Sequence, residues 1–425
     1  MNKLKDYWRR WCLCYRQYGL KYTIKKTFRR IGERRARKKA EKLALKNFSN
    51  SAANALPATK PTSAPADDML NLSDDQINVG FLLRGGLGDM VVSANYLYKF
   101  RQKYSDENLR IDVFSHNSFN SAKVVLYNGN VIDNLYKEEG FEKRFHDYDV
   151  FFDLSRYPNL KRRNDKKIAA MMPELFEYIH LSERFRSENA RFFTKAGITD
   201  GQSAMLSVIK GKKRINQPDI FEFFGITEKY EYEIPIMEDE LDYLKDIDLA
   251  DRKFITINRG VDTNYTSNSI KMWPLSYYNI LIALLKKKYP DLVLVQLGAS
   301  HDRCPAFENI DIDMVGKTNL EQVKVLLKHS LVHIDNEGGM VHLRHALGGG
   351  KSVVIFGPTS AEFFGYSENE NLVGNGCDTW CEWAVSGWQG GCLRGFHNAP
   401  CMASVTPEMV VDAVDRIIEK ENEKQ

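Results

Sequence analysis

The stretch that decides the fold reads Val79-Gly-Phe-Leu-Leu-Arg-Gly-Gly-Leu-Gly-Asp-Met90. An apolar strand runs into a turn that carries Gly85, Gly86 and Gly88, and helical signals follow directly. A strand, a glycine-rich turn and a helix N-terminus bring backbone N–H groups together at a place that favours anions. Asp89 therefore has two interpretations from the sequence alone. It either caps the helix that begins near the following residue or serves as a functional acid.

Apolar strands alternate with helical patterns along the rest of the chain. This alternation predicts an α/β fold with two doubly wound parallel-sheet, Rossmann-like domains that face a cleft, and with ligands at the carboxyl ends of the strands. We expect the first domain over 76–240 and the second over 250–425. The expected strands are 78–83, 110–114, 149–154, 253–258, 292–297, 331–334 and 352–356, and the expected helices are 89–103, 276–289 with Ser276 as its cap, 319–329, one around His342, and 407–421.

The N-terminal segment differs sharply in charge from the remainder of the 425-residue chain. Residues 1–46 hold 17 Lys or Arg against three acids, a local net charge of +14, so a total of +4 leaves −10 for the rest. Leu4, Trp8, Trp11 and Tyr15 recur on one helical face. We therefore expect 1–48 to be a basic amphipathic helical extension on an anionic membrane surface.

This segment has two alternative interpretations. A solvated or partner-binding helix is one alternative, and nucleic acid is not expected because an aromatic stripe suits lipid better than phosphate. Residues 49–75 contain Ser, Ala, Asn, Pro and Thr without an aromatic residue and are typical of a disordered linker. No run of eighteen apolar residues exists, and the N-terminus is too basic for a signal peptide. We expect a cytoplasmic protein, peripheral at the inner face of the membrane.

Four motifs follow one another in a fixed order. They are Gly-Gly-Leu-Gly-Asp at 85–89, Lys-Met-Trp-Pro at 271–274, Glu-Gly-Gly-Met-Val-His at 337–342 and Phe-Gly-Pro-Thr at 356–359. This order resembles glycosyltransferase family 9, the bacterial heptosyltransferases, over residues 78–415. The resemblance implies the GT-B architecture, in which the N-terminal domain holds the acceptor and the C-terminal domain holds a nucleotide-activated sugar such as ADP-heptose.

The resemblance also implies roles for individual residues. Asp89 matches the general base, which takes a proton from the acceptor hydroxyl during inversion, and no cofactor is required for that step. Glycines 85, 86 and 88 would form the loop beside acceptor and phosphate. The donor-binding residues implied are Lys271, Asp302, Glu337, Gly338, Gly339, His342, Gly357 and Thr359. In the family, Asp-(Ser/Thr)-Gly usually precedes the histidine, where this chain has Glu337-Gly338-Gly339 with Asp335 two residues earlier.

A late cysteine cluster is the second informative region. Cys377, Cys381, Cys392 and Cys401 lie within 25 residues. Four thiolates can enclose zinc or iron tetrahedrally. A structural metal site and a set of reduced, buried thiols are the two leading interpretations, and a redox role is a third.

The function expected is transfer of a heptose or related sugar from a nucleoside-diphosphate donor to a glycan or lipid-linked acceptor such as lipopolysaccharide. Transfer to an autotransporter-type protein is an alternative that a metal-bound cysteine cluster would favour. A non-catalytic nucleotide-sugar-binding protein is another, because the motif at Glu337 is altered. A dinucleotide-dependent oxidoreductase is not expected, because Ser115 and His116 stand where the ribose-binding acid would follow the second strand.

Overall fold

The computed structural model describes thirteen stretches of the chain. They are residues 72–104, 108–115, 119–138, 141–154, 157–188, 190, 217–228, 231–260, 269–301, 304–348, 350–377, 381 and 388–423. The predicted membrane-surface segment 1–48, the linker up to residue 71 and Asp302 lie outside the described residues. From Leu72 onward the chain forms one compact unit that contains two β-sheets.

The first sheet has the order β3-β2-β1-β4-β5. Its central strand β1 (Ile77–Leu83) is buried at every position, as expected for a strand covered on both faces. The neighbours are β2 (Leu109–Ser115), β3 (Asn134–Lys137) and β4 (Val150–Asp153), all parallel to one another, and β5 (Asn159–Arg163), which pairs antiparallel with β4. The prediction of a wholly parallel sheet is therefore wrong at this edge.

The second sheet has the order β11-β10-β9-β6-β7-β8, and all its strand pairs are parallel. The chain adds strands to one side of β6 up to β8 and to its other side from β9 onward. A doubly wound sheet opens a crevice at its carboxyl edge where the strand order reverses in this way, here between β6 and β9. The strands are β6 (Phe254–Asn258), β7 (Val293–Leu297), β8 (Ile312–Asp313), β9 (Val332–Asn336), β10 (Ser352–Phe356) and β11 (Glu370–Val373).

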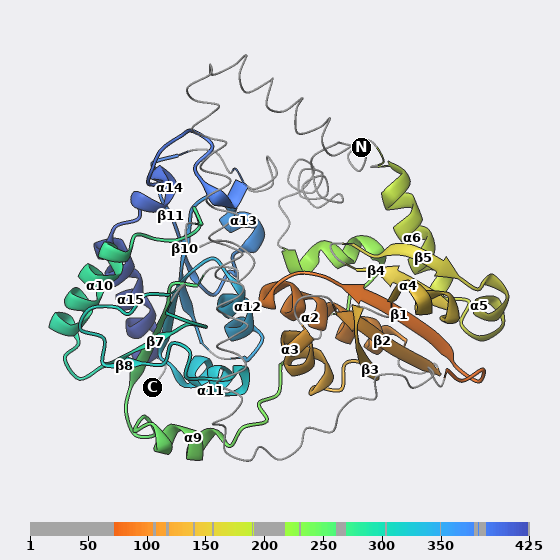
Figure 1. Cartoon of the computed structure of the whole chain (residues 1–425), viewed down its shortest axis with the longest axis horizontal. Coiled ribbons are helices and arrows are strands. Elements are labelled where there is room, and N and C mark those ends of the chain that lie inside the picture. Colours follow the sequence, from red (N-terminus) through yellow and green to blue (C-terminus); the bar gives the residue numbers. More distant parts are fainter. Residues whose placement is uncertain are drawn as a thin grey trace, which may run out of the picture. The chain divides into compact units, whose positions relative to one another are not determined.

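Helices connect the strands in both halves (Figure 1). In the first half these are α2 (Leu87–Lys103), α3 (Phe119–Ala122), the π-helical turn η1 (Lys123–Tyr127), α4 (Phe141–Arg144), η3 (Phe145–Asp147), α5 (Asp165–Met171), α6 (Leu175–Glu188) and η4 (Gln217–Phe224). In the second half they are α9 (Glu240–Asp246), α10 (Leu275–Lys288), α11 (Leu320–His329), α12 (Gly339–His345), α13 (Ala361–Phe364), η5 (Trp388–Gly390), α14 (Pro400–Ala403) and α15 (Pro407–Asn422).

The second sheet is covered on both faces by helices, because alternate side chains of a strand point to opposite faces. Val353 and Ile355 of β10 belong to a buried cluster with α10 and α15, whereas Val354 and Phe356 pack with Val341 of α12. The C-terminal helix α15 lies against α10, β10 and β11. The predicted helix 407–421 thus exists as α15 and packs on the second sheet.

Two helix starts differ from the expected ones. Helix α10 begins at Leu275 with Pro274 as its N-cap, so Ser276 is inside the first turn and is not the cap. Proline has a fixed φ and no N–H to lose, which suits a helix start. Helix α2 begins at Leu87, earlier than the predicted start near Met90. In contrast, α11 begins as expected after Asn319, whose side chain accepts the N–H of Gln322.

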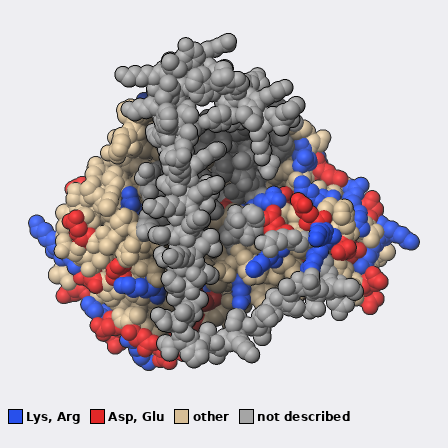
Figure 2. Space-filling view, in the orientation of Figure 1, with Lys and Arg blue, Asp and Glu red and all other residues tan. Residues whose placement is uncertain are grey.

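Acidic and basic side chains are intermixed on the face shown in Figure 2. Acidic and basic side chains also pair across elements, for example Arg163 with Glu183 and Arg84 with Glu138. The described residues on this face therefore form no continuous basic patch of the kind that phosphate backbones select.

Candidate active site

The turn between β1 and α2 holds Asp89 by its own backbone. Gly86 is the N-cap of α2, and its N–H donates to Asp89 Oδ2 at 2.8 Å. Gly85 has φ +130°, and a Cβ there would lie 2.2 Å from Asp89 Oδ2, so only glycine fits. Asp89 does cap its helix. A carboxylate can accept several hydrogen bonds, so this capping bond is compatible with a role as an acid or base.

Sequence reasoning missed an ion cluster at the carboxyl ends of the first sheet. Arg84, which follows β1, is 3.0 Å from Glu138 Oε1 beyond β3 and 3.4 Å from Asp153 Oδ2 at the end of β4. These side chains meet because the carboxyl ends of parallel strands share one edge. The signal available in the sequence was a charged residue at the end of two apolar strands, Arg84 directly after β1 and Asp153 as the last residue of β4.

The turn between β9 and α12 holds its acid through an ion pair with a different loop. Glu337 precedes the glycines, and its carboxylate forms an ion pair with Lys271 Nζ from the turn before α10. The Glu337 side chain is 9% exposed and that of Lys271 22%. Gly338, the N-cap of α12, has extended backbone and open space where a side chain would stand, apart from the carbonyl oxygen of Asn336 at 3.6 Å.

The turn that carries Lys271 is anchored by its own tryptophan. Trp273 is fully buried, and its indole N–H donates to the carbonyl oxygen of Val405 at 2.8 Å. Burying an indole removes roughly 200 Å² of surface from water, worth about 5 kcal/mol. Such an anchor holds the backbone at Lys271 in place while its ammonium remains partly exposed.

The glycine turn between β1 and α2, the first glycine turn, touches the one between β9 and α12, the second glycine turn. A Cβ on Gly339 would lie 2.9 Å from Leu87 Cβ and 3.0 Å from the backbone nitrogen of Gly88. A Cβ on Gly88 would lie 2.7 Å from His342 Cδ2. Helices α2 and α12 are accordingly in contact, as Figure 1 shows. The missing side chains of Gly88 and Gly339 therefore serve close packing between the helices, whereas the space beside Gly338 is open.

His342 lies between the acids of both turns. Burial lowers the pKa of its imidazole to about 4, although the nearby carboxylates of Glu337 and Asp89 act in the opposite direction. The ring is therefore neutral at pH 7. Its Nδ1 is 2.7 Å from the hydroxyl of Tyr366, a residue that sequence reasoning missed because no pattern surrounds it. His342 is thus both buried and part of the site.

Polar side chains at the ends of β6, β9 and β10 extend this site. Asn258 Nδ2 donates to Asp335 Oδ2 at 2.8 Å, and burial raises the pKa of Asp335. Arg259, directly after β6, donates from Nε to the carbonyl oxygen of Trp273 at 3.1 Å, which adds a second cation near Lys271. Thr359, after β10, is 4% exposed, and its hydroxyl has no hydrogen-bond partner among the described residues.

The cysteine cluster lies beside the loop after β10. A Cβ on Gly357 would lie 2.1 Å from Met402 Sδ and 3.5 Å from Cys401 Sγ, and the N–H of Cys381 donates to the carbonyl oxygen of Pro358 at 3.2 Å. The cysteines are free thiols, and burial, with smaller effects of Cys381, Cys377 and Cys392, raises the pKa of Cys401 to about 11. Within the described residues no group of His, Cys, Asp or Glu is arranged to hold a metal ion.

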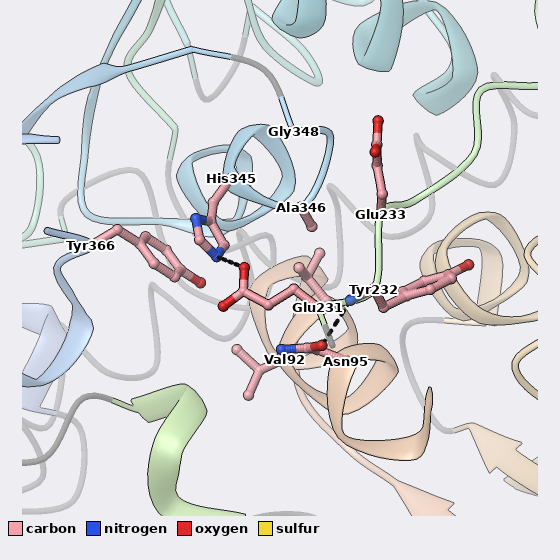
Figure 3. Close-up of a pocket in the computed structure, with 10 residues that line it drawn as sticks. Val92, Asn95, Glu231, Tyr232, Glu233, His345, Ala346, Gly348 and Tyr366 are labelled. Carbon is pink, nitrogen blue, oxygen red and sulfur yellow. Dashed lines mark hydrogen bonds and ion pairs between the residues drawn. The ribbon is translucent and has the colours of Figure 1, made fainter. Parts of the chain in front are cut away.

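Tyr366, which bonds His342, also lines a cavity of about 170 Å³ (Figure 3). It is lined by α2, the segment through Tyr232 and the end of α12, and Glu231 points toward His345 across it. Tyr366 is the link between this cavity and the site, since its hydroxyl bonds His342. None of the residues predicted from motifs lines the cavity.

The structure thus brings together Asp89, Lys271, Glu337, Gly338, Gly339 and His342. Gly357 and Thr359 follow the strand next to β9, and Asp302 lies outside the described residues. A positioned carboxylate, a neutral imidazole and two cations at the carboxyl edge of a doubly wound sheet can activate a hydroxyl and hold an anion.

Comparison with known families gives a match over part of the chain. Residues 220–386 match glycosyltransferase family 9 (heptosyltransferase). The match includes Lys271, Glu337, His342 and Thr359 and excludes Asp89. A search of curated protein sequences gives no match.

Solved structures show the same fold. A glycosyl transferase family 9 protein from Veillonella parvula DSM 2008 is 14% identical, with 83% of this chain and 100% of that chain covered and a TM-score of 0.53. The iron-containing dodecameric glycosyltransferase TibC from enterotoxigenic E. coli H10407 is 12% identical, with coverage of 81% and 77% and a TM-score of 0.56. TibC in complex with ADP-D-beta-D-heptose gives a TM-score of 0.55 at the same identity and coverage. The predicted α/β fold with two Rossmann-like domains is confirmed.

Proposed function

We propose that this chain, whose residues 220–386 match glycosyltransferase family 9 (heptosyltransferase), moves a heptose or related sugar from a nucleoside diphosphate to a glycan acceptor such as lipopolysaccharide, with inversion. The observation that carries the proposal is the contact between the two glycine turns. It brings the carboxylate of Asp89 from one sheet and the Lys271–Glu337 pair from the other around one buried imidazole, that of His342.

On the acceptor side, Asp89 is the residue suited to act as general base. The N–H of Gly86 fixes its carboxylate at the start of α2. A carboxylate held in place needs only to take a proton that becomes acidic as the hydroxyl attacks the anomeric carbon. The lone pair of the acceptor oxygen forms the new glycosidic bond, the bond from the anomeric carbon to the diphosphate oxygen breaks, and the proton goes to Asp89.

On the donor side, Lys271 and Arg259 supply positive charge for the diphosphate that leaves. In this structure Lys271 is paired with Glu337, so a bound diphosphate would draw the ammonium away from that carboxylate or share it. The hydroxyl of Thr359, which has no hydrogen-bond partner among the described residues, is a further donor for a phosphate oxygen. TibC was solved with an ADP-heptose, which makes ADP the first nucleotide to test.

A donor screen with the purified full-length chain tests the proposal. ADP-heptose, ADP-glucose, UDP-glucose and GDP-mannose are incubated with truncated lipopolysaccharide, and product mass and released nucleotide are measured. Transfer from ADP-heptose with the others far slower is the expected result. Tight ADP binding without transfer to any acceptor would favour a non-catalytic binding protein. Binding of NAD in preference to ADP would contradict the proposal.

A structural metal on the cysteine loop is a separate part of the proposal. It is supported by the likeness to TibC, which is described as iron-containing, and by the mutual proximity of four thiols. Zinc or iron would have to be held by Cys377, Cys381, Cys392 and Cys401 after rearrangement, since the described side chains are not set for it. About one metal per chain by elemental analysis, lost in Cys377→Ser together with thermal stability, is expected. No metal, with four thiols that react on unfolding, would establish reduced thiols.

Membrane attachment through residues 1–48 completes the proposal and rests on sequence alone. Within the described residues no helix is long and apolar enough to cross a bilayer. The +14 charge of residues 1–46 and their aromatic stripe favour peripheral binding at the inner face of the cytoplasmic membrane. Deletion of 1–48 should abolish sedimentation with anionic vesicles and preserve transfer to a soluble acceptor. Vesicles of neutral lipid are the matched control, and continued sedimentation of the truncated chain would place the anchor elsewhere.

A further inference from the structure

Tyr366 and His342 form a buried, hydrogen-bonded pair. Both residues are 5% exposed, and the Tyr366 hydroxyl lies 2.7 Å from His342 Nδ1. Their rings meet edge to face at 5.5 Å. Tyr366 stands in the connection between α13 and β11, so the bond joins two separate elements of the C-terminal half.

The direction of this hydrogen bond follows from proton counting. Burial raises the pKa of the Tyr366 phenol far above neutrality, and burial lowers the pKa of His342. At pH 7 there are therefore one phenolic proton and one imidazole proton. Among the described residues the Tyr366 hydroxyl has no partner other than His342 Nδ1. If it only accepted, its buried proton would be left without an acceptor, which costs roughly 1–3 kcal/mol. The hydroxyl therefore donates to Nδ1, and the imidazole proton is on Nε2.

The other edge of the imidazole faces the first glycine turn. A Cβ on Gly88 would lie 2.7 Å from His342 Cδ2 and 3.4 Å from Nε2. The carboxylates of Glu337 and Asp89 lie close enough to act on the pKa of this ring. The Nε2–H is thus directed to the place where the two turns meet.

The ring of Tyr366 also packs against a second histidine. The imidazole of His345 stacks on it with ring centroids 3.7 Å apart and planes 16° from parallel. His345 Nδ1 bonds Glu368 Oε1 at 2.5 Å, and its Nε2 is 3.8 Å from Glu231 Oε2 (Figure 3). Since both nitrogens of His345 have carboxylate partners, its ring and the phenol stacked on it are fixed in orientation.

We propose that Tyr366 is a positioning residue, whose hydroxyl holds His342 in the Nε2-protonated tautomer so that this N–H donates to an anionic oxygen of the bound nucleotide sugar. The inference rests on the proposed function for the identity of the ligand. The tautomer itself can be measured without any substrate. A hydrogen bond to one ring nitrogen that fixes the tautomer of a functional imidazole is a general device in enzymes.

Long-range ¹H–¹⁵N correlation spectra of the full-length chain with ¹⁵N-labelled histidine test the tautomer. The signal of His342 is identified by its loss in His342→Gln. At pH 7 the wild type should show protonation at Nε2, and Tyr366→Phe should shift the signal toward a mixture of tautomers. Tyr243→Phe is the matched control, because the Tyr243 hydroxyl is buried without a hydrogen-bond partner among the described residues. Protonation of His342 at Nδ1 in the wild type would overturn the proposal even if Tyr366→Phe failed to fold.

Kinetics provide the second readout. Tyr366→Phe should lower kcat about tenfold, the worth of roughly one hydrogen bond, with KM for the acceptor unchanged. In a His342→Gln background the same change should cost nothing further, because the two residues act as a unit. A tautomer shift without sugar transfer by the wild type would refute the proposed function and retain the positioning role. Full activity of Tyr366→Phe with an unchanged spectrum would refute the positioning role and leave the function standing.

Discussion

The two glycine turns are alike in plan and opposite in the use of their acid. Each follows a strand inside its sheet, and each starts a helix with glycine at the N-cap. In the first turn the acid, Asp89, comes after the glycines and is held by the backbone of its own turn. In the second, Glu337 comes before them and is paired with a lysine from a different loop. The carboxylate of Asp89 is fixed and therefore suited to proton transfer. The lysine of the Lys271–Glu337 pair can exchange its carboxylate partner for a bound anion, so this pair is suited to anion binding.

Removal of the exchangeable lysine is expected to have the largest effect on binding. Lys271→Met should weaken ADP affinity roughly 10- to 100-fold, since a hydrogen bond from a charged group contributes about 1.5–3 kcal/mol. Part of the loss should be recovered in Lys271→Met with Glu337→Gln, because the carboxylate left unpaired in the single variant would repel the diphosphate. Titration calorimetry with ADP measures both. An ADP affinity within twofold of wild type in the single variant would remove Lys271 from the site.

Acid should destabilise the second turn through His342. The pKa of this imidazole is about 4 in the folded chain, against an ordinary value of 6.5. Below pH 6.5 the unfolded chain therefore takes up a proton that the folded chain does not, and stability falls as the pH drops toward 4. Between pH 7 and 5 the wild type should lose about 2 kcal/mol more than His342→Gln, measured by urea unfolding. Equal losses of unfolding free energy in both proteins would show that His342 keeps the ordinary pKa of an exposed imidazole.

The close packing of the turns should tolerate no methyl group. Gly88→Ala places a Cβ 2.7 Å from the His342 ring, and overpacking costs about 1–3 kcal/mol. Alanine regains up to about 1 kcal/mol of helix propensity, so a net loss of about 1 kcal/mol is expected. Gly391→Ala is the matched control, because a Cβ at Gly391 meets nothing within 4 Å and Gly391 is the N-cap of none of the described helices. Equal melting temperatures of the two variants would contradict the close packing of α2 against α12 at Gly88.

Much of the fold was predictable because its strands are continuous apolar runs bounded by clear turn signals. The predicted strand 352–356 coincides with β10, and every expected strand exists. The strands missed are short or carry little apolar pattern. In β3 (Asn134–Lys137) no residue is buried, and β5 reads Asn-Leu-Lys-Arg-Arg, which resembles a surface loop. Edge strands form through pairing with a neighbour more than through their own pattern.

The site was predictable where glycines mark a turn and not where single residues act. The motif glycines led to Asp89, Glu337 and His342, which do come together. Tyr366 and Arg259 contribute through tertiary contacts, and nothing in their immediate sequence distinguishes them. The sequence also gave no reason to expect that Gly88 and Gly339 make room for each other's helices. Contacts between residues some 250 positions apart depend on the assembled fold.

The turnover of Asp89→Asn at saturating donor, measured together with its ADP affinity, tests the account most directly. Asparagine can still accept the N–H of Gly86, so the turn and the ADP affinity should be unchanged. It cannot take a proton, so sugar transfer should fall by at least about 100-fold, the usual contribution of a positioned base. Turnover within threefold of wild type, with ADP bound equally well, would reduce Asp89 to a helix cap and contradict the division of labour between the two turns.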